Sequence, residues 1–227
     1  MTTLTAIVPF YNEAQTILLS LQNLEKVDIL DEIILIDDGS TDNSHLLVTD
    51  FCLGKEKFKV ISSELNKGKG SALRNAQNHI NTEYVVIHDA DLEYNPQDLY
   101  SMYNLVDGKN LVLGSRFIGD ARRTNIYKRT LLANKVMSAF FSVVHQKKIS
   151  DVATCYKMMP SSFFKNIDFR EEGFSIEIEI LSKFLKQNRS ISEVPIQYNG
   201  RTYEQGKKIK TKDGFLYLFN TLKYRLR

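Results

Sequence analysis

The sequence has few cysteines and little net charge, and each scarcity argues against a class of protein. Its two cysteines, Cys52 and Cys155, lie far apart and lack the spacing of metal ligands. We therefore expect reduced thiols in a cytosolic protein rather than a disulfide framework or a zinc site. The formal net charge is only +3, which does not by itself indicate nucleic-acid binding. With 227 residues, 43% of them apolar, the chain is long enough to form a core without disulfides.

Long apolar runs are also missing. No stretch approaches ~18 consecutive apolar residues, so the sequence predicts no membrane-spanning helix. The first residues, 1–6, lack the basic region and apolar run of a signal peptide, so we expect a cytoplasmic protein. Basic residues gather within 122–129 and again within 201–227. These two segments are compatible with peripheral contact to the anionic inner face of a membrane.

Strand and helix patterns alternate along the first half of the chain. Apolar runs rich in β-branched residues end in polar turns and are followed by helical periodicity. These repeated units predict an α/β fold with a mostly parallel sheet. In the second half, the pattern predicts two long helices, a strand and a final amphipathic helix. The predicted strands cover 4–9, 32–36, 58–61, 84–87, 111–114 and 190–198, and the later helices cover 124–145, 173–184 and 213–227.

Three acids follow the buried strand at 84–87. Asp89, Asp91 and Glu93 are spaced two apart, and ligands of open α/β sheets bind at the carboxyl ends of the strands. Carboxylates in this place can hold a hard divalent cation against the phosphates of a substrate. A solvated turn is the alternative, and an Asp-x-Asp pair alone does not decide between them.

Other polar turns end strands at the same edge of the predicted sheet. The turn 9–13 offers an aromatic ring for stacking and a carboxylate, and Asp38 can accept hydrogen bonds from a base or a ribose. A helix-capping turn is the alternative for the segment 37–40. Lys69, in a glycine-bearing loop, can neutralise phosphate. However, Leu73 stands where a dinucleotide-binding loop needs its last glycine, so the known phosphate-loop motifs do not fit.

Taken together and in order, these segments resemble the family 2 inverting glycosyltransferases. The resemblance rests on Ile7–Glu13, Ile36–Asp42, Asn66–Gly70, His88–Glu93 and Gly114–Phe117. Within the family, the chain is most similar to the dolichol-phosphate mannosyltransferase and polyprenyl-phosphate glycosyltransferase branch. The resemblance implies a GT-A fold over residues 1–212, with a nucleotide-sugar-binding half at 1–118. An acceptor half with a closing loop would follow at 119–212, and an amphipathic helix at 213–227.

The resemblance also implies roles for individual residues. The implied nucleotide-binding residues are Pro9, Tyr11, Glu13, Asp37, Asp38, Lys69, Asp89 and Ala90. The implied ligands of Mg²⁺ or Mn²⁺ are Asp89, Asp91 and Glu93, where many relatives carry glutamine in place of Glu93. The implied catalytic residues are Asp91, Arg116, Asp151 and Arg201. The implied acceptor-binding residues are Arg116, Glu179, Arg201, Lys207 and Lys208.

The function implied is transfer of a sugar from a UDP- or GDP-sugar to a polyprenyl phosphate, dolichyl or undecaprenyl. Two alternatives stay open. A transferase that extends a glycan at a sugar hydroxyl would need a general base, for which Asp151 is the candidate. A non-catalytic subunit that binds nucleotide-sugars is the other. The apolar helix at 131–144 permits a homodimer, and a membrane-protein partner is equally compatible with the sequence.

Overall fold

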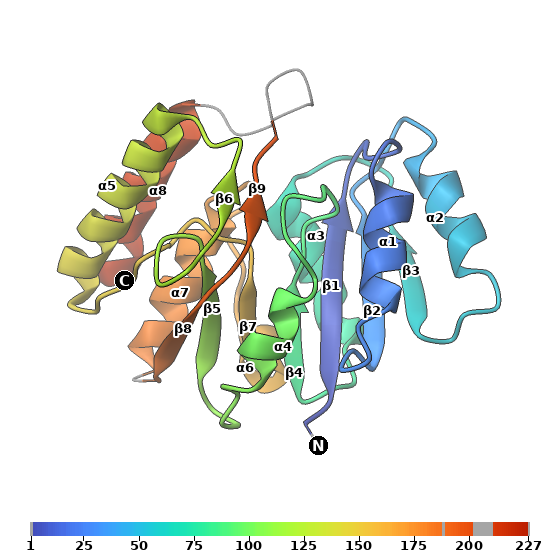
Figure 1. Ribbon diagram of the computed structural model, residues 1–227, viewed down its shortest axis with the longest axis horizontal. Coiled ribbons are helices and arrows are strands. Elements are labelled where there is room, and N and C mark those ends of the chain that lie inside the picture. Colours follow the sequence, from blue (N-terminus) through green and yellow to red (C-terminus); the bar gives the residue numbers. More distant parts are fainter. Residues whose placement is uncertain (1, 188, 202–210, 227) are drawn as a thin grey trace.

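A mostly parallel seven-stranded sheet forms the centre of the molecule (Figure 1), in the order β3-β2-β1-β4-β7-β5-β8. The structure is a computed structural model that describes residues 2–187, 189–201 and 211–226. The predicted α/β architecture is confirmed. Its strands are β3 (Phe58–Ser62), β2 (Glu32–Asp37), β1 (Leu4–Phe10), β4 (Tyr84–Ile87), β7 (Lys157–Pro160), β5 (Leu111–Ser115) and β8 (Ile191–Pro195).

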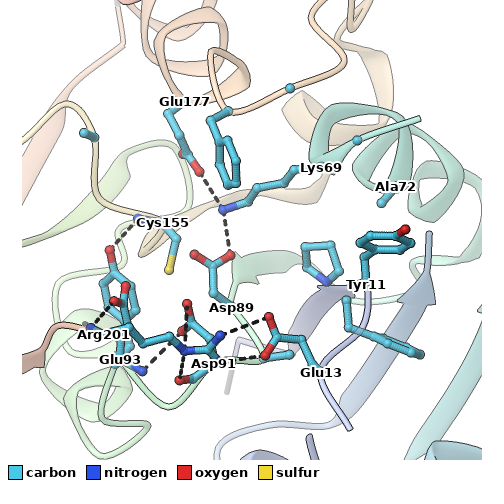
Figure 2. Close-up of a pocket in the computed structure, with 18 of the residues that line it drawn as sticks. Tyr11, Glu13, Lys69, Ala72, Asp89, Asp91, Glu93, Cys155, Glu177 and Arg201 are labelled. Carbon is cyan, nitrogen blue, oxygen red and sulfur yellow. Dashed lines mark hydrogen bonds and ion pairs between the residues drawn. The ribbon is translucent and has the colours of Figure 1, made fainter. Parts of the chain in front are cut away.

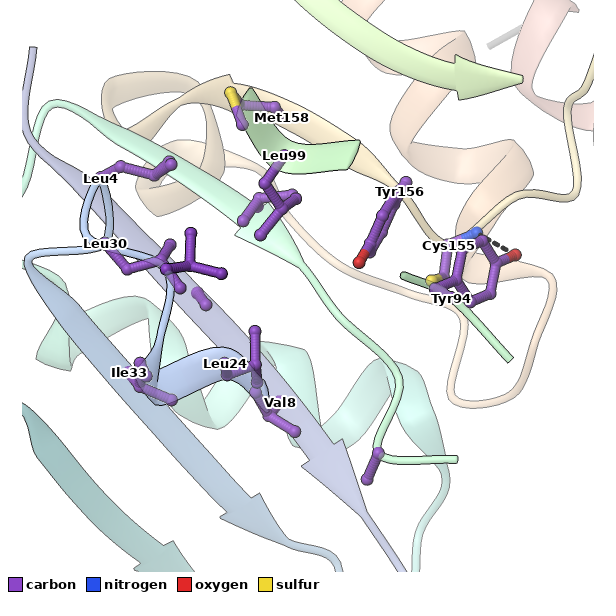
Figure 3. Packing of buried hydrophobic residues seen from close by; sticks show 14 of the residues in the cluster. Leu4, Val8, Leu24, Leu30, Ile33, Tyr94, Leu99, Cys155, Tyr156 and Met158 are labelled. Atoms are coloured by element: carbon purple, nitrogen blue, oxygen red, sulfur yellow. Dashed lines mark hydrogen bonds between the residues drawn. The ribbon is translucent and has the colours of Figure 1, made fainter. Parts of the chain in front are cut away.

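Helices cover both faces of this sheet, because alternate residues of its strands point to opposite sides. Leu4, Ala6 and Val8 of β1 pack with α1 (Ile17–Glu25), α2 (Ser44–Cys52) and α4 (Asp98–Tyr103). Part of this cluster is seen in Figure 3. On the other face, Ile7 belongs to a cluster that includes residues of α3 (Lys69–Ala76), α6 (Ser161–Asn166) and α7 (Ile176–Lys186). Both faces of the central strands are therefore buried, which explains their near-continuous apolar sequences.

One strand of the sheet was not predicted. β7 lies between β4 and β5 and is antiparallel to both. Its sequence, Lys-Met-Met-Pro, is short and begins with a lysine, so it does not read as a buried strand. The predicted strand 190–198 is also divided. β8 ends at Pro195, and β9 (Tyr198–Asn199) pairs in parallel with β6 (Arg123–Thr124) in a separate two-stranded sheet.

The helices of the second half form one side of the molecule. α5 (Lys128–His145) and α8 (Thr211–Leu226) lie side by side, and α8 also packs on α7 (Figure 1). A short 3-10 helix, η1 (Gln77–His79), follows α3. None of the helices in the described part of the chain combines the length and the apolar character needed to cross a membrane.

A polar turn separates β1 from the first helix, α1. This helix begins at Ile17, and Asn12 in the preceding turn adopts a left-handed backbone conformation (φ 51°). The Asn12 side chain accepts a hydrogen bond from the backbone N–H of Thr41 (2.8 Å). It thereby joins the turn after β1 to the turn after β2.

Candidate active site

A pocket of about 290 Å³ lies at the carboxyl ends of β1, β2 and β4. Figure 2 shows that acids from several segments turn toward one another in it. Eleven of the residues to which the sequence assigned roles line this pocket. They are Pro9, Tyr11, Glu13, Asp38, Lys69, Asp89, Ala90, Asp91, Glu93, Arg116 and Arg201.

Asp38 holds the glycine-bearing loop against the pocket. Its carboxylate accepts hydrogen bonds from the backbone N–H groups of Lys67 (3.1 Å) and Gly68 (2.6 Å). Gly68 has φ +100°, and a Cβ there would lie 2.4 Å from the carbonyl oxygen of Glu172. Only glycine permits both this conformation and this close approach. Burial raises the pKa of Asp38 above its ordinary value.

The acidic end of the pocket consists of three carboxylates around one arginine. Arg201 donates to both oxygens of Glu13 (2.6 and 3.2 Å) and, through Nε, to the backbone carbonyl of Asp91 (3.0 Å). When Glu13, Asp91 and Glu93 are all ionised, three negative charges face one positive charge, which leaves a local charge of −2. Burial, together with repulsion from Glu93 and Asp89, raises the pKa of Asp91 to about 8.

Glu93 uses both carboxylate oxygens to hold other residues. It accepts hydrogen bonds from the Tyr198 hydroxyl (2.6 Å) and from the backbone N–H of Arg201 (2.6 Å). Its own N–H donates to Asp91 (3.2 Å). Between the two acids, Leu92 has φ 61°, a conformation that costs an ordinary residue about 1–2 kcal/mol. Glu93 thus connects the β9 segment to the Asp89–Glu93 loop.

A second ionic cluster, at the other side of Asp89, is electrically balanced. The Lys69 ammonium lies between Asp89 (2.7 Å) and Glu177 (2.8 Å), and Glu177 also pairs with the buried Lys157. Burial disfavours the Lys69 ammonium, but the two carboxylates outweigh it and raise the pKa of Lys69 well above its usual range. The cluster fixes the side chain of Asp89.

Glu177 is a pocket residue that was not predicted from the sequence. The family pattern pointed instead to Glu179, two residues along the same helix. Glu177 is 2% exposed, lines the pocket and pairs with two lysines. A signal was present in the sequence, because Lys157 stands within an apolar stretch and a buried lysine needs an anionic partner.

Arg116 and Asp151 form a buried ion pair. The guanidinium donates to both carboxylate oxygens (2.7 and 2.8 Å), and the Arg116 backbone N–H donates to one of them (3.0 Å). The guanidinium carbon lies 4.8 Å from the centre of the Tyr198 ring, a distance typical of a cation–π contact. Arg116 lines the pocket, whereas Asp151 lies behind it and is completely buried.

Two further predicted residues also lie outside the pocket lining. Asp37 accepts a hydrogen bond from the Ser40 backbone N–H (2.8 Å) and contacts His45 (2.9 Å), so it stabilises the turn after β2. Glu179 is fully buried and accepts hydrogen bonds from the backbone of Arg170 (3.0 Å). Lys207 and Lys208 lie outside the described residues.

The acidic end suits a divalent cation that a substrate helps to hold. The described residues contain no group of three or more acids, histidines or cysteines arranged as a complete metal site. Mg²⁺ in particular is usually bound by one or two carboxylates together with substrate phosphates and water. Asp89 and Asp91 can supply those carboxylates, and a divalent cation would balance the local charge of −2. The donor set therefore fits Mg²⁺ or Mn²⁺ only in company with a phosphate-bearing substrate.

Comparison with known proteins identifies relatives of this chain. Residues 5–168 match the family described as "Glycosyl transferase family 2". The chain is 28% identical to a dolichyl-phosphate beta-glucosyltransferase of Saccharomyces cerevisiae, over 86% of this chain and 66% of the yeast protein. It is 25% identical to a polyprenol monophosphomannose synthase of Mycolicibacterium smegmatis, over 86% of this chain and 77% of that protein.

Solved structures share the fold. A glucosyl-3-phosphoglycerate synthase from Mycobacterium tuberculosis, in complex with Mn²⁺, UDP-glucose and phosphoglyceric acid, superposes with a TM-score of 0.74 at 18% identity. The match covers 99% of this chain and 79% of that one. The same enzyme with Mg²⁺ and UDP gives a TM-score of 0.71 at 19% identity, over 99% of this chain and 79% of that one. These matches confirm the expected GT-A fold.

Proposed function

Because this chain belongs to glycosyl transferase family 2 and is a transferase enzyme, we propose that it moves a sugar from a nucleotide-diphosphate sugar to a polyprenyl phosphate, with inversion. The chain spans 66% of the length of its yeast relative, and that relative and the mycobacterial one are named for lipid-phosphate acceptors. Residues of the turns after β1 and β2 line one part of the pocket, which we assign to the nucleoside. The acids after β4 would lie beside the diphosphate.

The observation that carries this proposal is the division of charge in the pocket. The cluster of Lys69, Asp89, Glu177 and Lys157 is balanced, whereas the cluster around Asp91 has an excess of two negative charges once Asp91 is ionised, as it must be to bind a cation. We infer that Asp89 and Asp91 hold Mg²⁺ or Mn²⁺. A bound cation of this kind supplies charge stabilisation for a departing nucleoside diphosphate.

The chain's own residues would then act by position and charge. Asp38 and Glu13 would bind the nucleoside, and Lys69 would exchange one carboxylate partner for a phosphate oxygen. Arg201 and Arg116 line the same pocket and would supply positive charge beside the acids. Asp37 and Asp151 would act indirectly, by fixing the turn after β2 and the Arg116 guanidinium.

A phosphate acceptor agrees best with the burial and pairing of the candidate general base, Asp151. A phosphate oxygen is already anionic at neutral pH and needs no general base to attack the anomeric carbon. A sugar hydroxyl would need one. The base candidate, Asp151, is completely buried and has both oxygens bound by Arg116. We therefore place the glycan-extending alternative second and the non-catalytic subunit third.

A transfer assay tests the proposal. The protein is incubated with UDP-glucose, UDP-N-acetylglucosamine or GDP-mannose, Mn²⁺ and a short-chain polyprenyl phosphate, and products are identified by mass spectrometry. We expect a glycosyl phospholipid that Asp91→Ala abolishes and Asp50→Ala, at an exposed acid of α2, does not. Turnover only on sugar hydroxyls would favour the second reading. Donor binding without any transfer would favour the third.

A further inference from the structure

The outer sides of α5 and α8 carry most of the exposed apolar side chains. Eight of the thirteen large exposed hydrophobic residues in the described part of the chain belong to these two helices. On α8, Phe215, Phe219, Leu222 and Leu226 are 73%, 64%, 46% and 86% exposed. Their spacing places them on one stripe of the helix. The opposite side packs on the domain, where the Tyr217 hydroxyl donates to the carbonyl of Phe174 (2.8 Å).

α5 continues this surface. Leu132, Val136 and Val143 are 65%, 53% and 77% exposed, again at helical spacing, while Phe141 on the other side of the helix is buried. The two helices lie next to each other at one side of the molecule (Figure 1). Together these residues form one surface, which we call the α5/α8 face.

The described charged side chains of α5 and α8 are all of one sign. Residues 122–148 and 214–226 contain no aspartate or glutamate. Lys128, Lys135 and Arg225 are exposed, and helical geometry places the two α5 lysines, seven residues apart, together along one edge of its apolar stripe. An apolar stripe bordered by cations matches an anionic lipid surface, where apolar side chains enter the headgroup boundary and lysines meet lipid phosphates. Two copies of the face would instead bring like charges together.

The pocket reaches the same two helices. Thr130 and Asn134 of α5 and Tyr217 of α8 line it, so these helices carry pocket residues on one side and the exposed apolar stripes on another. A lipid acceptor has its phosphate at the boundary between water and hydrocarbon. A protein lying on this face would hold the pocket near that boundary.

From these observations we propose that the α5/α8 face is a docking surface for an anionic lipid bilayer and presents the pocket to a membrane-embedded acceptor. The last part of this proposal rests on the proposed transfer to polyprenyl phosphate. The docking itself does not, because it follows from the apolar stripes and the surrounding cations.

Vesicle flotation of the purified full chain tests the docking. We expect binding to phosphatidylcholine vesicles that contain about 30% phosphatidylglycerol, and at least tenfold weaker binding to pure phosphatidylcholine. The double variant Phe215→Ser/Phe219→Ser should lower binding at least tenfold, and Lys128→Glu/Lys135→Glu should lower it on anionic vesicles. Leu46→Ser/Leu53→Ser is the matched control, since these leucines are 59% and 72% exposed in and just after α2, and it should bind like the wild type.

Three results would overturn the docking surface. The first is that the protein binds neither kind of vesicle. The second is that the double phenylalanine variant binds as well as the wild type. The third is that light scattering shows a wild-type dimer and a monomeric phenylalanine variant. The last would make the face an interface between copies. Thermal unfolding of each variant establishes that it is folded. Transfer to a short-chain, water-soluble polyprenyl phosphate without vesicles separates the two proposals. If the wild type does not transfer sugar to this acceptor, the proposed function is contradicted. If it transfers sugar but does not bind vesicles, only the docking surface is contradicted.

Discussion

Replacing Glu93 by alanine should damage the site by releasing the β9 segment, not by removing a metal ligand. The substitution deletes two hydrogen bonds, from Tyr198 and from the Arg201 backbone, both of 2.6 Å. Hydrogen bonds to a charged group contribute about 1.5–3 kcal/mol each. Water can replace part of this at a half-buried side chain. We therefore expect a net loss of about 2 kcal/mol in transition-state stabilisation, a fall of about 30-fold in kcat/KM.

Glu93→Gln should retain most activity, within about threefold of the wild type. Its amide oxygen can still accept from Arg201, and its NH₂ group can donate to the Tyr198 oxygen. Steady-state transfer kinetics measure both variants. Mn²⁺ titration by electron paramagnetic resonance, with UDP present, then separates positioning from ligation.

In that titration, Glu93→Ala should weaken Mn²⁺ binding only a few-fold. Glu13→Ala, which removes another negative charge from the same pocket, should have a similarly small effect. Asp91→Ala should weaken Mn²⁺ binding by at least ~100-fold, because removing a metal ligand lowers the affinity more than removing a residue that only contacts a ligand. If Glu93→Ala weakens Mn²⁺ binding as much as Asp91→Ala, then Glu93 is a ligand and the reasoning is wrong.

Three further predictions concern stability. Glu177→Gln leaves two buried lysines with too little negative charge and should cost about 3 kcal/mol, a fall in Tm of about 6–12 °C by calorimetry; an unchanged Tm would refute the cluster's role. Gly68→Ala should cost more than Gly108→Ala in urea unfolding, because both glycines have positive φ (+100° and +86°) but only Gly68 approaches another backbone; equal losses would contradict this. The pKa of Glu171 is held at about 2, because hydrogen bonds from Lys223, Tyr224 and others outweigh its burial. A lowered folded pKa means that stability is present above pH ~4.5 and is lost as the pH falls toward ~2. Glu171→Gln should flatten that part of the stability profile in urea unfolding at stepped pH values, and an unchanged profile would count against it.

The parallel core could be predicted from sequence because its strands are buried on both faces. The strand at 84–87 was located to the residue, since a β-branched run there ends abruptly in His88 and Asp89. The acids after β1, β2 and β4 could then be expected to meet, because carboxyl ends of parallel strands share one edge.

Long-range charge pairing could not be predicted in the same way. Sequence spacing does not reveal that Lys157 from β7 and Lys69 from α3 meet at Glu177, or that Arg201 reaches Glu13. Glu177 and Glu179 look alike as acids near a helix N-terminus, and only the packing of α7 turns one of them into the pocket. Asp151 was likewise expected to be a catalytic residue, but it is completely buried and paired with Arg116 behind the pocket.

The most direct test of the central claim is a competition between two acceptors that differ only in the phosphate. The enzyme is given UDP-glucose, or the donor that the panel identifies, with Mn²⁺ and equal amounts of a short polyprenyl phosphate and the corresponding free polyprenol. The proposed function predicts that mass spectrometry finds sugar only on the phosphate, and that the coupling of the anomeric proton shows inversion. Sugar on the polyprenol and none on the phosphate would contradict it.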